Sequence, residues 1–299
     1  MNTRSFYSFI LISCAFISTA MAQANLLNAR VPQEIGQLNE QQIEANDETP
    51  LAYGYIDDRD ILWSKTIWEI IDLDERINFP YYYPTDTLNL GPDRRALFHV
   101  LKKNLRNGSI KEVYDDDYFQ SKLTYQEILD KLVAVDTTDM GREQLNAGEE
   151  LDPQFITRRT ITAAEIRQYR VKGTWYVNKR LGELKYRLLG IAPVAPDVYT
   201  LDLPEEEQDL VELFWVWFPD ARKSLNESQV FNNRNSSQPI TYDHMLNSRR
   251  FNSLIYKEEN VYEDRKIEEY IFEDALKQLL ESERVKSVIR DFEQDLWNN

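Results

Sequence analysis

His99 and His244 are the side chains of this sequence best suited to acid, base or metal chemistry, but each stands alone. Both lie in segments with helical apolar spacing, and neither belongs to an HExxH pair that would bind zinc. The sequence also has no GxSxG turn for a nucleophilic serine, and its nine glycines form no glycine-rich phosphate loop. We therefore expect both histidines to be structural.

Carboxylates are abundant, and their densest clusters are 57–60 (Asp-Asp-Arg-Asp) and 115–117 (Asp-Asp-Asp). Neither cluster has the spacing of an EF-hand calcium loop. Paired carboxylates beside aromatic rings could form a glycosidase cleft, but among 51 acidic residues such pairs arise freely. We predict surface caps and loop ends here, with no catalytic residue, no cofactor and no metal.

The single cysteine, Cys14, lies inside an N-terminal segment that has the features of an export signal. Arg4 precedes an apolar stretch over residues 6–16, and Ala20-Met21-Ala22 fits the small-x-small cleavage rule. The stretch is shorter than the roughly 20 apolar residues that span a membrane. The sequence predicts a signal peptide over 1–22, with lipid attachment at Cys14 as the alternative.

Removal of residues 1–22 would leave no cysteine, which excludes disulfides and thiolate chemistry in the mature chain. The formal net charge of −16 repels nucleic acid and anionic membrane surfaces. The same charge favours a basic partner, or it serves solubility alone, and both interpretations stay open.

Apolar spacing and capping residues predict the elements of the first half of the chain. We expect a helix over 60–73, capped by Asp60, because Trp63, Ile67, Ile70 and Ile71 recur at helical spacing. The other expected elements are an extended strip at Tyr81–Tyr83 between two prolines, a helix from Pro92-Asp93 to Gly108, a strand over 110–114, and a helix that begins with the Thr124–Glu127 capping box.

The second half is predicted to mix strands and helices. A second capping box, Thr162–Glu165, predicts another helix. Runs 174–177 and 184–191 suit a β-hairpin, and the barely alternating run 211–218 predicts a strand covered on both faces. We also expect a helix over 241–251, a strand over 253–257 and a long, charged helical segment over 263–297.

These elements predict an α+β fold with small mixed or antiparallel sheets, several capped helices and a long C-terminal helical segment. We divide the chain into a signal peptide (1–22), a flexible N-terminal arm (23–52), a first α+β unit (53–135), a linker (136–160) and a second α+β unit (161–299) with the C-terminal helix.

A faint internal repeat suggests that the two units arose by tandem duplication. Val113-Tyr-Asp-Asp and Val230-Phe-Asn-Asn are 117 positions apart, and Leu123-Thr-Tyr and Ile240-Thr-Tyr share that offset. Each copy would contain a strand, a polar loop and a capped helix. Coincidence is the alternative interpretation.

Aromatic clusters could either pack in the core or form a contact surface, since Tyr, Trp and Arg dominate interface hot spots. Trp63 and Trp68 lie five residues apart on the expected helix, so they would point to different faces. One of them would then lie outside a one-sided core. The predicted partner-binding residues are Asp57, Asp58, Arg59, Trp63, Trp68, Tyr81, Tyr82 and Tyr83.

Residues 57–80, DDRDILWSKTIWEIIDLDERINFP, followed by YYYP, strongly resemble the GldN/PorN family. Further strings that carry the resemblance are VYDDD (113–117), LGIAP (189–193), LFWVWFP (213–219), FNSLIYKEENVYEDR (251–265) and the acidic tail that ends in DLW (295–297). The resemblance spans roughly 55–297, which is nearly the whole mature chain.

The resemblance implies a non-enzymatic, periplasmic structural component of the type IX secretion system of Bacteroidota. It implies a ring built with a GldK/PorK-type outer-membrane lipoprotein, and contact with the periplasmic domain of a GldM/PorM-type motor protein. Net charge and the length of the apolar runs, independently of the resemblance, predict no nucleic acid partner and no direct membrane span. A role in secretion alone and a role that includes gliding motility look alike in sequence. An exported carbohydrate-active or carbohydrate-binding protein, or a soluble periplasmic chaperone, are the alternatives.

Overall fold

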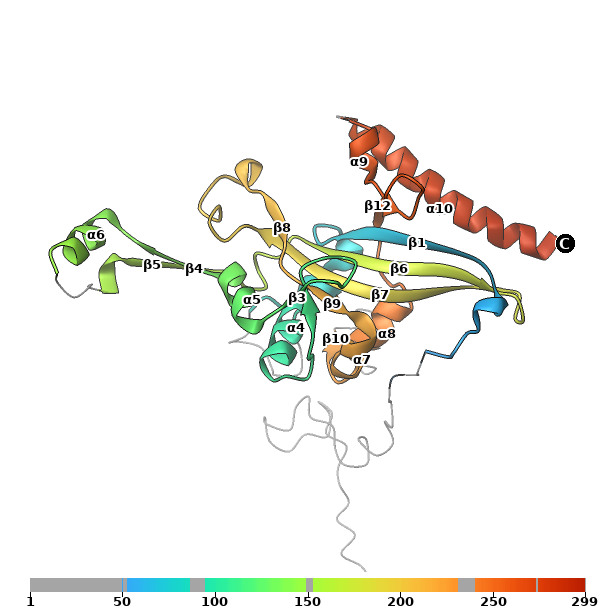
Figure 1. Ribbon diagram of the computed structural model, residues 1–299, viewed down its shortest axis with the longest axis horizontal. Coiled ribbons are helices and arrows are strands. Elements are labelled where there is room, and N and C mark those ends of the chain that lie inside the picture. Colours follow the sequence, from blue (N-terminus) through green and yellow to red (C-terminus); the bar gives the residue numbers. More distant parts are fainter. Residues whose placement is uncertain are drawn as a thin grey trace, which may run out of the picture. The chain divides into compact units, whose positions relative to one another are not determined.

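An eight-stranded antiparallel sheet organises the chain, with strand order β12-β1-β6-β7-β9-β2-β3 and β8 paired to β7 (Figure 1). The computed structural model describes residue 50 and residues 53–86, 95–148, 153–230, 240–272 and 274–298. The predicted signal peptide, Cys14 and nearly all of the predicted arm lie outside these residues. The strands of the sheet are β1 (Ile61–Asp72), β2 (Val113–Tyr114), β3 (Lys122–Leu123), β6 (Gln168–Asn178), β7 (Glu183–Pro196), β8 (Leu210–Glu212), β9 (Trp215–Trp217) and β12 (Leu254–Glu258).

Residues 61–72 form strand β1, so the helix predicted over 60–73 is wrong. The strand pairs with β6 from Ile61↔Asn178 to Asp72↔Gln168, and with β12 over Ile67–Ile70. Its isoleucines satisfy a helical spacing, but β-branched residues also favour a pleated strand. The choice depends on partners more than 90 residues away in sequence, which local spacing does not reveal.

Strands β6 and β7 form the predicted hairpin, which is confirmed over its whole length from Asn178↔Glu183 to Gln168↔Val194. A bulge lies between Lys172 and Gly173. A Cβ atom at Gly173 would lie 2.1 Å from the Tyr186 hydroxyl oxygen, so only glycine fits there. The close approach of the Tyr186 side chain to β6 therefore depends on this glycine.

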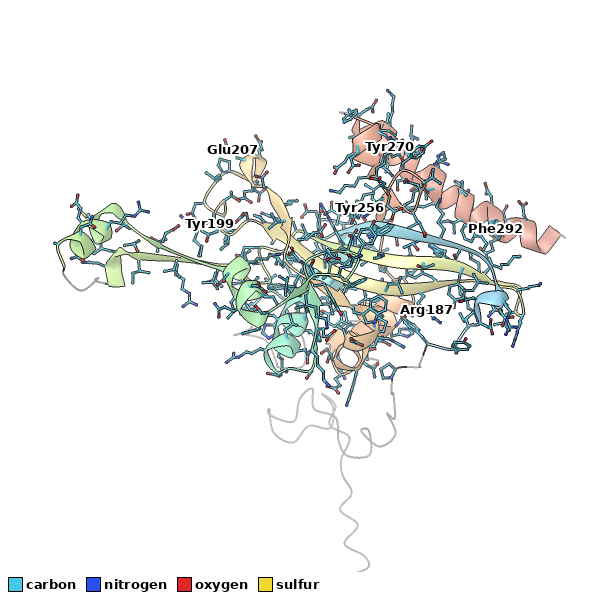
Figure 2. The ribbon with its side chains drawn as sticks, viewed as in Figure 1. Arg187, Tyr199, Glu207, Tyr256, Tyr270 and Phe292 are labelled. Carbon is cyan, nitrogen blue, oxygen red and sulfur yellow. The ribbon has the colours of Figure 1, made fainter. Side chains whose placement is uncertain are left out.

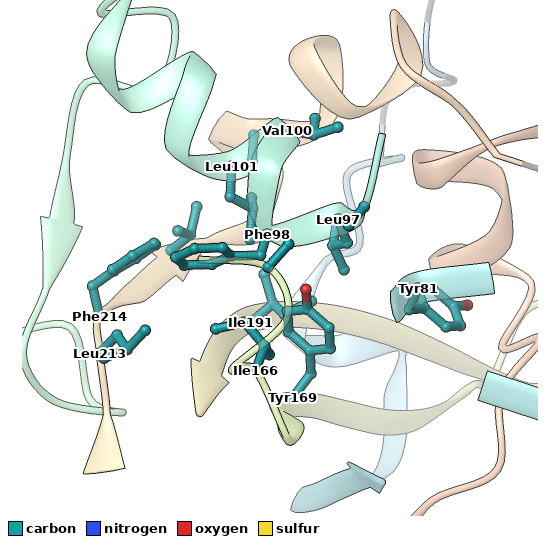
Figure 3. Packing of buried hydrophobic residues seen from close by; sticks show 14 of the residues in the cluster. Tyr81, Leu97, Phe98, Val100, Leu101, Ile166, Tyr169, Ile191, Leu213 and Phe214 are labelled. Carbon is teal, nitrogen blue, oxygen red and sulfur yellow. The ribbon is translucent and has the colours of Figure 1, made fainter. Parts of the chain in front are cut away.

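The main core lies between one face of the sheet and helices α3 (Phe79–Tyr82), α4 (Leu97–Arg106), α5 (Tyr125–Leu132), α7 (Phe218–Asn226) and α8 (Tyr242–Asn247). Figure 3 shows Phe98 and Leu101 of α4 close to Tyr169 and Ile191 of the sheet. Helix α4 is the helix predicted to end at Gly108. Its predicted start at Pro92-Asp93 lies outside the described residues.

The strip Tyr81–Tyr83 was expected to be extended, and this is wrong for its first two residues. Pro80 occupies the first turn of α3, where the missing N–H costs nothing, and the helix ends at Tyr82. Only Tyr83 is extended, with φ −92° and ψ 147°.

One of the two predicted capping boxes begins a helix. Thr124 and Glu127 form the reciprocal pair that caps α5 (Tyr125–Leu132), as predicted. Glu165 accepts from the N–H and hydroxyl of Thr162 at 2.6 and 2.5 Å, but a turn follows instead of a helix. Ile166 is buried in the core and the Arg167 N–H donates to the Val194 carbonyl, so the chain joins the sheet directly.

Residues 211–218 are covered on both faces as expected, but they form two short strands, β8 and β9, rather than one. Phe214 and Val216 point into the main core, while Trp215 packs with Trp68 and Ala192 on the opposite face of the sheet. The Leu213 N–H donates to the Pro193 carbonyl, which keeps the interrupted segment beside β7.

The segment predicted as a linker, 136–160, contains regular structure. Strand β4 (Val133–Thr137) pairs with β5 (Ile156–Thr160), with helix α6 (Asp139–Asn146) and the short helix η4 (Pro153–Phe155) between them. Strands on both sides of this segment pair within the large sheet, as β1 does with β6. The division into two units remains a prediction.

Local structure agrees with the faint repeat. The pair Val113↔Leu123 of β2 and β3 precedes the Thr124 cap of α5. At the 117-residue offset, Val230↔Ile240 of β10 (Gln229–Val230) and β11 (Ile240–Thr241) precedes the Thr241 cap of α8. Both copies thus share strand register and helix start.

The C-terminal segment is helical, as predicted, and consists of α9 (Ile267–Tyr270) and α10 (Ala275–Asn298). Helix α10 packs through Val285 and Ile289 on Ile67 of β1 and Ile255 of β12. Within the described ranges, no helix is both long and apolar enough to cross a membrane.

Candidate interaction surface

The predicted contact segment begins with an exposed turn, helix η2 (Asp58–Asp60). The Asp57 carboxylate accepts from the Arg59 backbone and pairs with its guanidinium at 3.0 Å, which lowers the pKa of Asp57. Asp60 pairs with Arg180 at 2.8 Å and thereby joins the turn to the β6–β7 connection. Asp58 and Arg59 are exposed, so this turn presents charge to solvent.

Trp63 and Trp68 lie on opposite faces of β1. Trp63 is half-buried, and its ring stacks on that of Phe292 with centroids 4.8 Å apart. Figure 2 labels Phe292 on α10. Trp68 is 1% exposed and lies beneath the Lys172 and Lys257 ammonium groups, 4.7 and 4.3 Å from its ring. Trp68 therefore has no surface to offer a partner.

The three neighbouring tyrosines have different environments. Tyr81 is fully buried in the core, so it too has no surface for a partner. Tyr82 is half-buried and donates to the Ala164 carbonyl at 2.9 Å. Tyr83 is 51% exposed, and its ring meets the Phe79 and Tyr82 rings edge-on. An aromatic ledge of Phe79, Tyr82 and Tyr83 therefore faces solvent.

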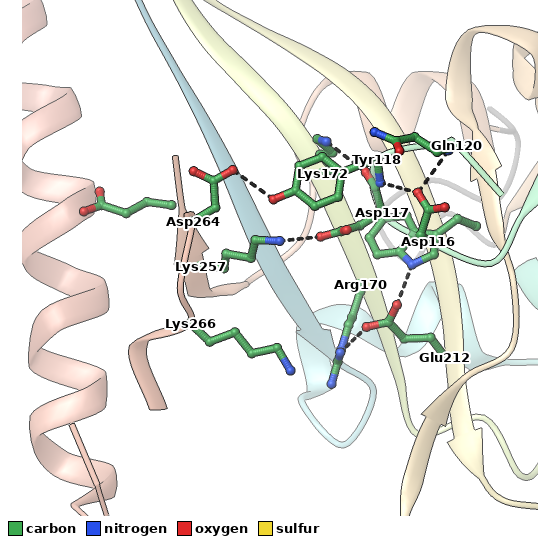
Figure 4. Close-up of polar contacts among 12 residues, drawn as sticks. Asp116, Asp117, Tyr118, Gln120, Arg170, Lys172, Glu212, Lys257, Asp264 and Lys266 are labelled. Carbon is green, nitrogen blue, oxygen red and sulfur yellow. Dashed lines mark hydrogen bonds and ion pairs between the residues drawn. The ribbon is translucent and has the colours of Figure 1, made fainter. Parts of the chain in front are cut away.

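Sequence reasoning missed a polar cluster around Asp117 (Figure 4), whose two lysines, Lys172 and Lys257, lie over the Trp68 ring. Asp117 accepts from Lys257 at 2.7 Å, and its backbone carbonyl accepts from Lys172 at 2.8 Å. Tyr118 donates to Asp264 at 2.9 Å. These contacts attach the 115–121 loop to β6, β12 and the turn that follows β12. The acidic run 115–117 therefore stabilises the fold.

Asp116 shapes that loop from within. Its carboxylate accepts from the backbone N–H groups of Tyr118, Gln120 and Ser121 at 2.8, 3.1 and 2.7 Å. Partial burial opposes ionisation, but these hydrogen bonds outweigh it and lower the pKa of Asp116. An aspartate before Tyr-Phe in a polar run is the sequence signal that indicates such an Asx-type turn.

The lysines of the cluster respond differently to burial. Burial lowers the pKa of Lys172, which donates to the Asp117 carbonyl. Burial has the same effect on Lys257, but the hydrogen bond to Asp117 outweighs it and raises the pKa. Both groups lie over aromatic faces, where a cation is stabilised by the ring quadrupole.

A buried ion pair fixes the chain after α8 to β1. Glu69, 1% exposed, accepts from Arg249 at 2.7 and 2.8 Å and from the Ser253 hydroxyl at 2.7 Å. The Arg249 guanidinium lies 4.2 Å from the Tyr186 ring centre, and its backbone has φ +50°. Sequence reasoning missed this pair because its members are 180 positions apart.

Tyr53 marks where the described chain joins the fold. Its hydroxyl donates to the Asn247 side-chain oxygen at 2.7 Å, and the Arg222 and Arg187 guanidinium groups lie over its ring, 4.4 and 4.8 Å from the centroid. Arg222 also pairs with the buried Asp243 at 2.8 Å. Burial raises the pKa of Tyr53 to about 12, against the opposing effect of Arg222.

The side chains that could do acid, base or metal chemistry are either paired within the fold or far from one another. Across the described residues, no group of three or more His, Cys, Asp or Glu is arranged to hold a metal ion. His99 lies on α4, and burial, with nearby basic residues, lowers its pKa. His244 lies exposed on α8.

The strings that carry the family resemblance converge in space. Segments 57–80, 113–117, 189–193, 213–219 and 251–265 contribute β1, β2, part of β7, β9 and β12, which belong to one sheet. Trp68, Asp117, Trp215 and Lys257 from these segments meet in the cluster of Figure 4 or beside it.

Comparison with known proteins gives one family match. The profile of the family described as "Gliding motility associated protein GldN" matches residues 56–298. No curated protein sequence matches the chain significantly.

Proposed function

The chain belongs to the GldN family of gliding motility associated proteins, and from this premise we propose that it is a non-enzymatic structural component of the type IX secretion system. The family match over residues 56–298 carries the proposal, because it covers the whole sheet, every sheet-packing helix and the resemblance strings.

The chemistry of the side chains supports an architectural role. The best-placed carboxylates, Glu69, Asp117 and Asp243, bind cations of their own fold. A buried carboxylate that is already paired is poorly placed to act as a base on a substrate. We infer that the chain acts through contacts with other proteins.

We propose that the exposed turn at Asp57–Arg59 and the ledge of Phe79, Tyr82 and Tyr83 contribute to those contacts. The turn supplies charge, and the ledge supplies rigid aromatic area of the kind that forms hot spots. Trp63 would act indirectly, by holding α10 against β1.

The partners we propose are a GldK/PorK-type outer-membrane lipoprotein and the periplasmic domain of a GldM/PorM-type motor protein. Repeated lipoprotein complexes would close a periplasmic ring, which requires a heterologous interface. The net charge of −16 favours basic surfaces on these partners. We propose a periplasmic location, with association to the outer membrane through the lipoprotein.

Purification of the native protein from its own cells, followed by sizing and identification of bound proteins, tests this function. We expect a megadalton assembly that contains the lipoprotein, with secretion lost on deletion of the chain. A small one-to-one complex with a single exported client would instead indicate a chaperone. Turnover of a small molecule by the pure protein, abolished by one substitution, would overturn the non-enzymatic role.

A further inference from the structure

Strands β1 and β12 separate at the Ile67 end of their pairing, and we call the gap between them the fork. β12 pairs with β1 only over Ile67–Ile70, while β1 continues back to Ile61 beside β6. The last contact across the fork is the Glu259 N–H, which donates to the Thr66 carbonyl at 3.0 Å. Beyond it the chain turns away, because the Asn260 N–H donates to the Asp264 carboxylate.

The fork leaves a backbone edge without a strand. In a β-strand, alternate residues direct both backbone groups to the same side. Thr66 directs its carbonyl toward the β12 side, so Ser64, two residues earlier, directs its N–H and carbonyl there as well. Among the described strands, β6 flanks Ser64 on the other side and none pairs with it on this side.

A hollow of about 460 Å³ occupies the fork. Residues 63–65 line one wall, and residues 259–261 line the other. This volume lies within the 300–1,000 Å³ range of ligand pockets. Val261 is 90% exposed and Leu62 is 55% exposed, so apolar side chains flank the hollow.

The charges around the hollow are unequal. Lys65, on the β1 wall, is neutralised by Glu258 at 2.8 Å. Glu259, on the opposite wall, is exposed, forms no salt bridge within the described part of the chain, and acts on the Lys172 charge only at longer range. The free charge of the hollow is therefore negative, in a chain whose net charge is −16.

We propose that this fork binds an extended peptide segment of a partner protein, which adds a strand to the free edge of β1 at Ser64 and places a lysine or arginine against Glu259. Main-chain hydrogen bonds would supply affinity, and side-chain pockets would supply preference, as in β-strand addition generally. The inference deepens the proposed function, on which it rests, by naming the binding mode and the partner chemistry.

An extended peptide fits these features better than a compact ligand. Unpaired backbone groups along an edge are a template for another chain. A small cation would need several oxygen ligands, and the hollow offers one free carboxylate. A peptide strand uses the edge, the volume and the charge together.

Fluorescence anisotropy with a labelled octapeptide of alternating threonine and valine, with one central lysine, tests the proposal on the full chain. We expect saturable binding, at least tenfold weaker when glutamate replaces the lysine. N-methylation of alternate peptide residues, which removes the N–H donors, should abolish binding. Absence of binding by the lysine peptide, or equal binding by the N-methylated peptide, would overturn the proposal.

Two substitutions at Ser64 distinguish the contribution of its backbone N–H to peptide binding from that of its side chain. Ser64→Pro removes the N–H from the free edge, where proline is tolerated in a strand, and should weaken binding at least tenfold. Ser64→Ala keeps the N–H and should bind like the parent chain. If Ser64→Pro fails to fold, the N-methylated peptide gives the same information with the unaltered protein.

A charge reversal tests the role assigned to Glu259. Glu259→Lys should reverse the preference, so that the glutamate peptide binds more tightly than the lysine peptide. Glu206→Lys makes the same change at an exposed position on the helix η5 (Glu205–Glu207) and should leave the preference unaltered. An unchanged preference in Glu259→Lys contradicts the assignment.

The peptide-binding experiment and the purification of the native assembly give independent results. Failure of the peptide to bind overturns the free-edge site while the assembly still stands. Absence of the megadalton assembly from cells overturns the proposed function and leaves the peptide measurement intact.

Discussion

At the scale of single residues, this protein uses charge inside the fold to join segments that are far apart in sequence. Glu69 and Arg249, Arg222 and Asp243, and Asp117 with Lys257 connect strands, helices and a loop. A buried pair adds little net stability over a hydrophobic replacement, but the loss of one partner leaves a costly unpaired charge. Such pairs therefore specify which segments meet.

The substitution Arg249→Met should destabilise the protein by about 3–5 kcal/mol, because it leaves the Glu69 carboxyl buried without its cationic partner. Urea unfolding monitored by tryptophan fluorescence measures this change. Arg265→Met is the matched control, since Arg265 is exposed and lies over the Tyr262 and Tyr270 rings, and it should cost less than about 1 kcal/mol. An equal effect of both substitutions would contradict the role of the buried pair.

Tyr53 predicts how stability changes in alkaline solution. Burial disfavours the phenolate and raises the pKa of Tyr53 in the folded state from its ordinary value of 10.0 to about 12. A raised pKa contributes stability that is present below pH 10 and is lost as the pH rises through 12. Unfolding free energies between pH 9 and 12 should fall less steeply in Tyr53→Phe than in the parent chain. Identical slopes would show that Tyr53 titrates as it does in the unfolded chain.

At the scale of elements, sequence patterns succeeded where the signal was local. The Thr124 capping box, the β6–β7 hairpin and the C-terminal helix were all predicted. The helix predicted over 60–73 failed because strand partners decided the conformation of β1. Thr162–Glu165 formed its side-chain bonds without a helix, since the burial of Ile166 directs the chain into the sheet. Short-range capping and turn signals could thus be predicted from the sequence. The conformations that long-range packing decides could not.

Helix α10 depends on a short apolar seam for its attachment to the sheet. Ile289→Ala should cost about 2–4 kcal/mol for local unfolding of α10, because Ile289 packs on Ile67 and Ile255. Hydrogen exchange of α10 amides detects this loss of protection. Val288→Ala changes the neighbouring residue, which is 43% exposed, and should leave the exchange nearly unaltered. Similar loss of protection in both variants would show that Ile289 does not attach α10 to the sheet.

At the scale of the whole molecule, the candidate contact residues divide by burial. Of the eight residues predicted to bind a partner, Trp68 and Tyr81 support the interior, while Asp58, Arg59 and Tyr83 reach solvent. Composition indicated an aromatic and acidic chain, but it carried no information on which rings the fold would bury. The free edge at Ser64 was equally hidden, because it exists only where β12 stops short of β1.

This division gives a test that separates folding from assembly. Tyr83→Ala should leave stability nearly unchanged but weaken capture of the partner lipoprotein at least tenfold, because an exposed aromatic residue in a ledge is a typical hot spot. Tyr199→Ala removes a ring that is 63% exposed in the turn after β7 (Figure 2), and it should alter neither property. Capture that both variants retain would exclude the ledge from the interface. A loss of stability in Tyr83→Ala would show that the ledge supports the core, since Phe79 and Tyr82 would then depend on Tyr83 for their positions.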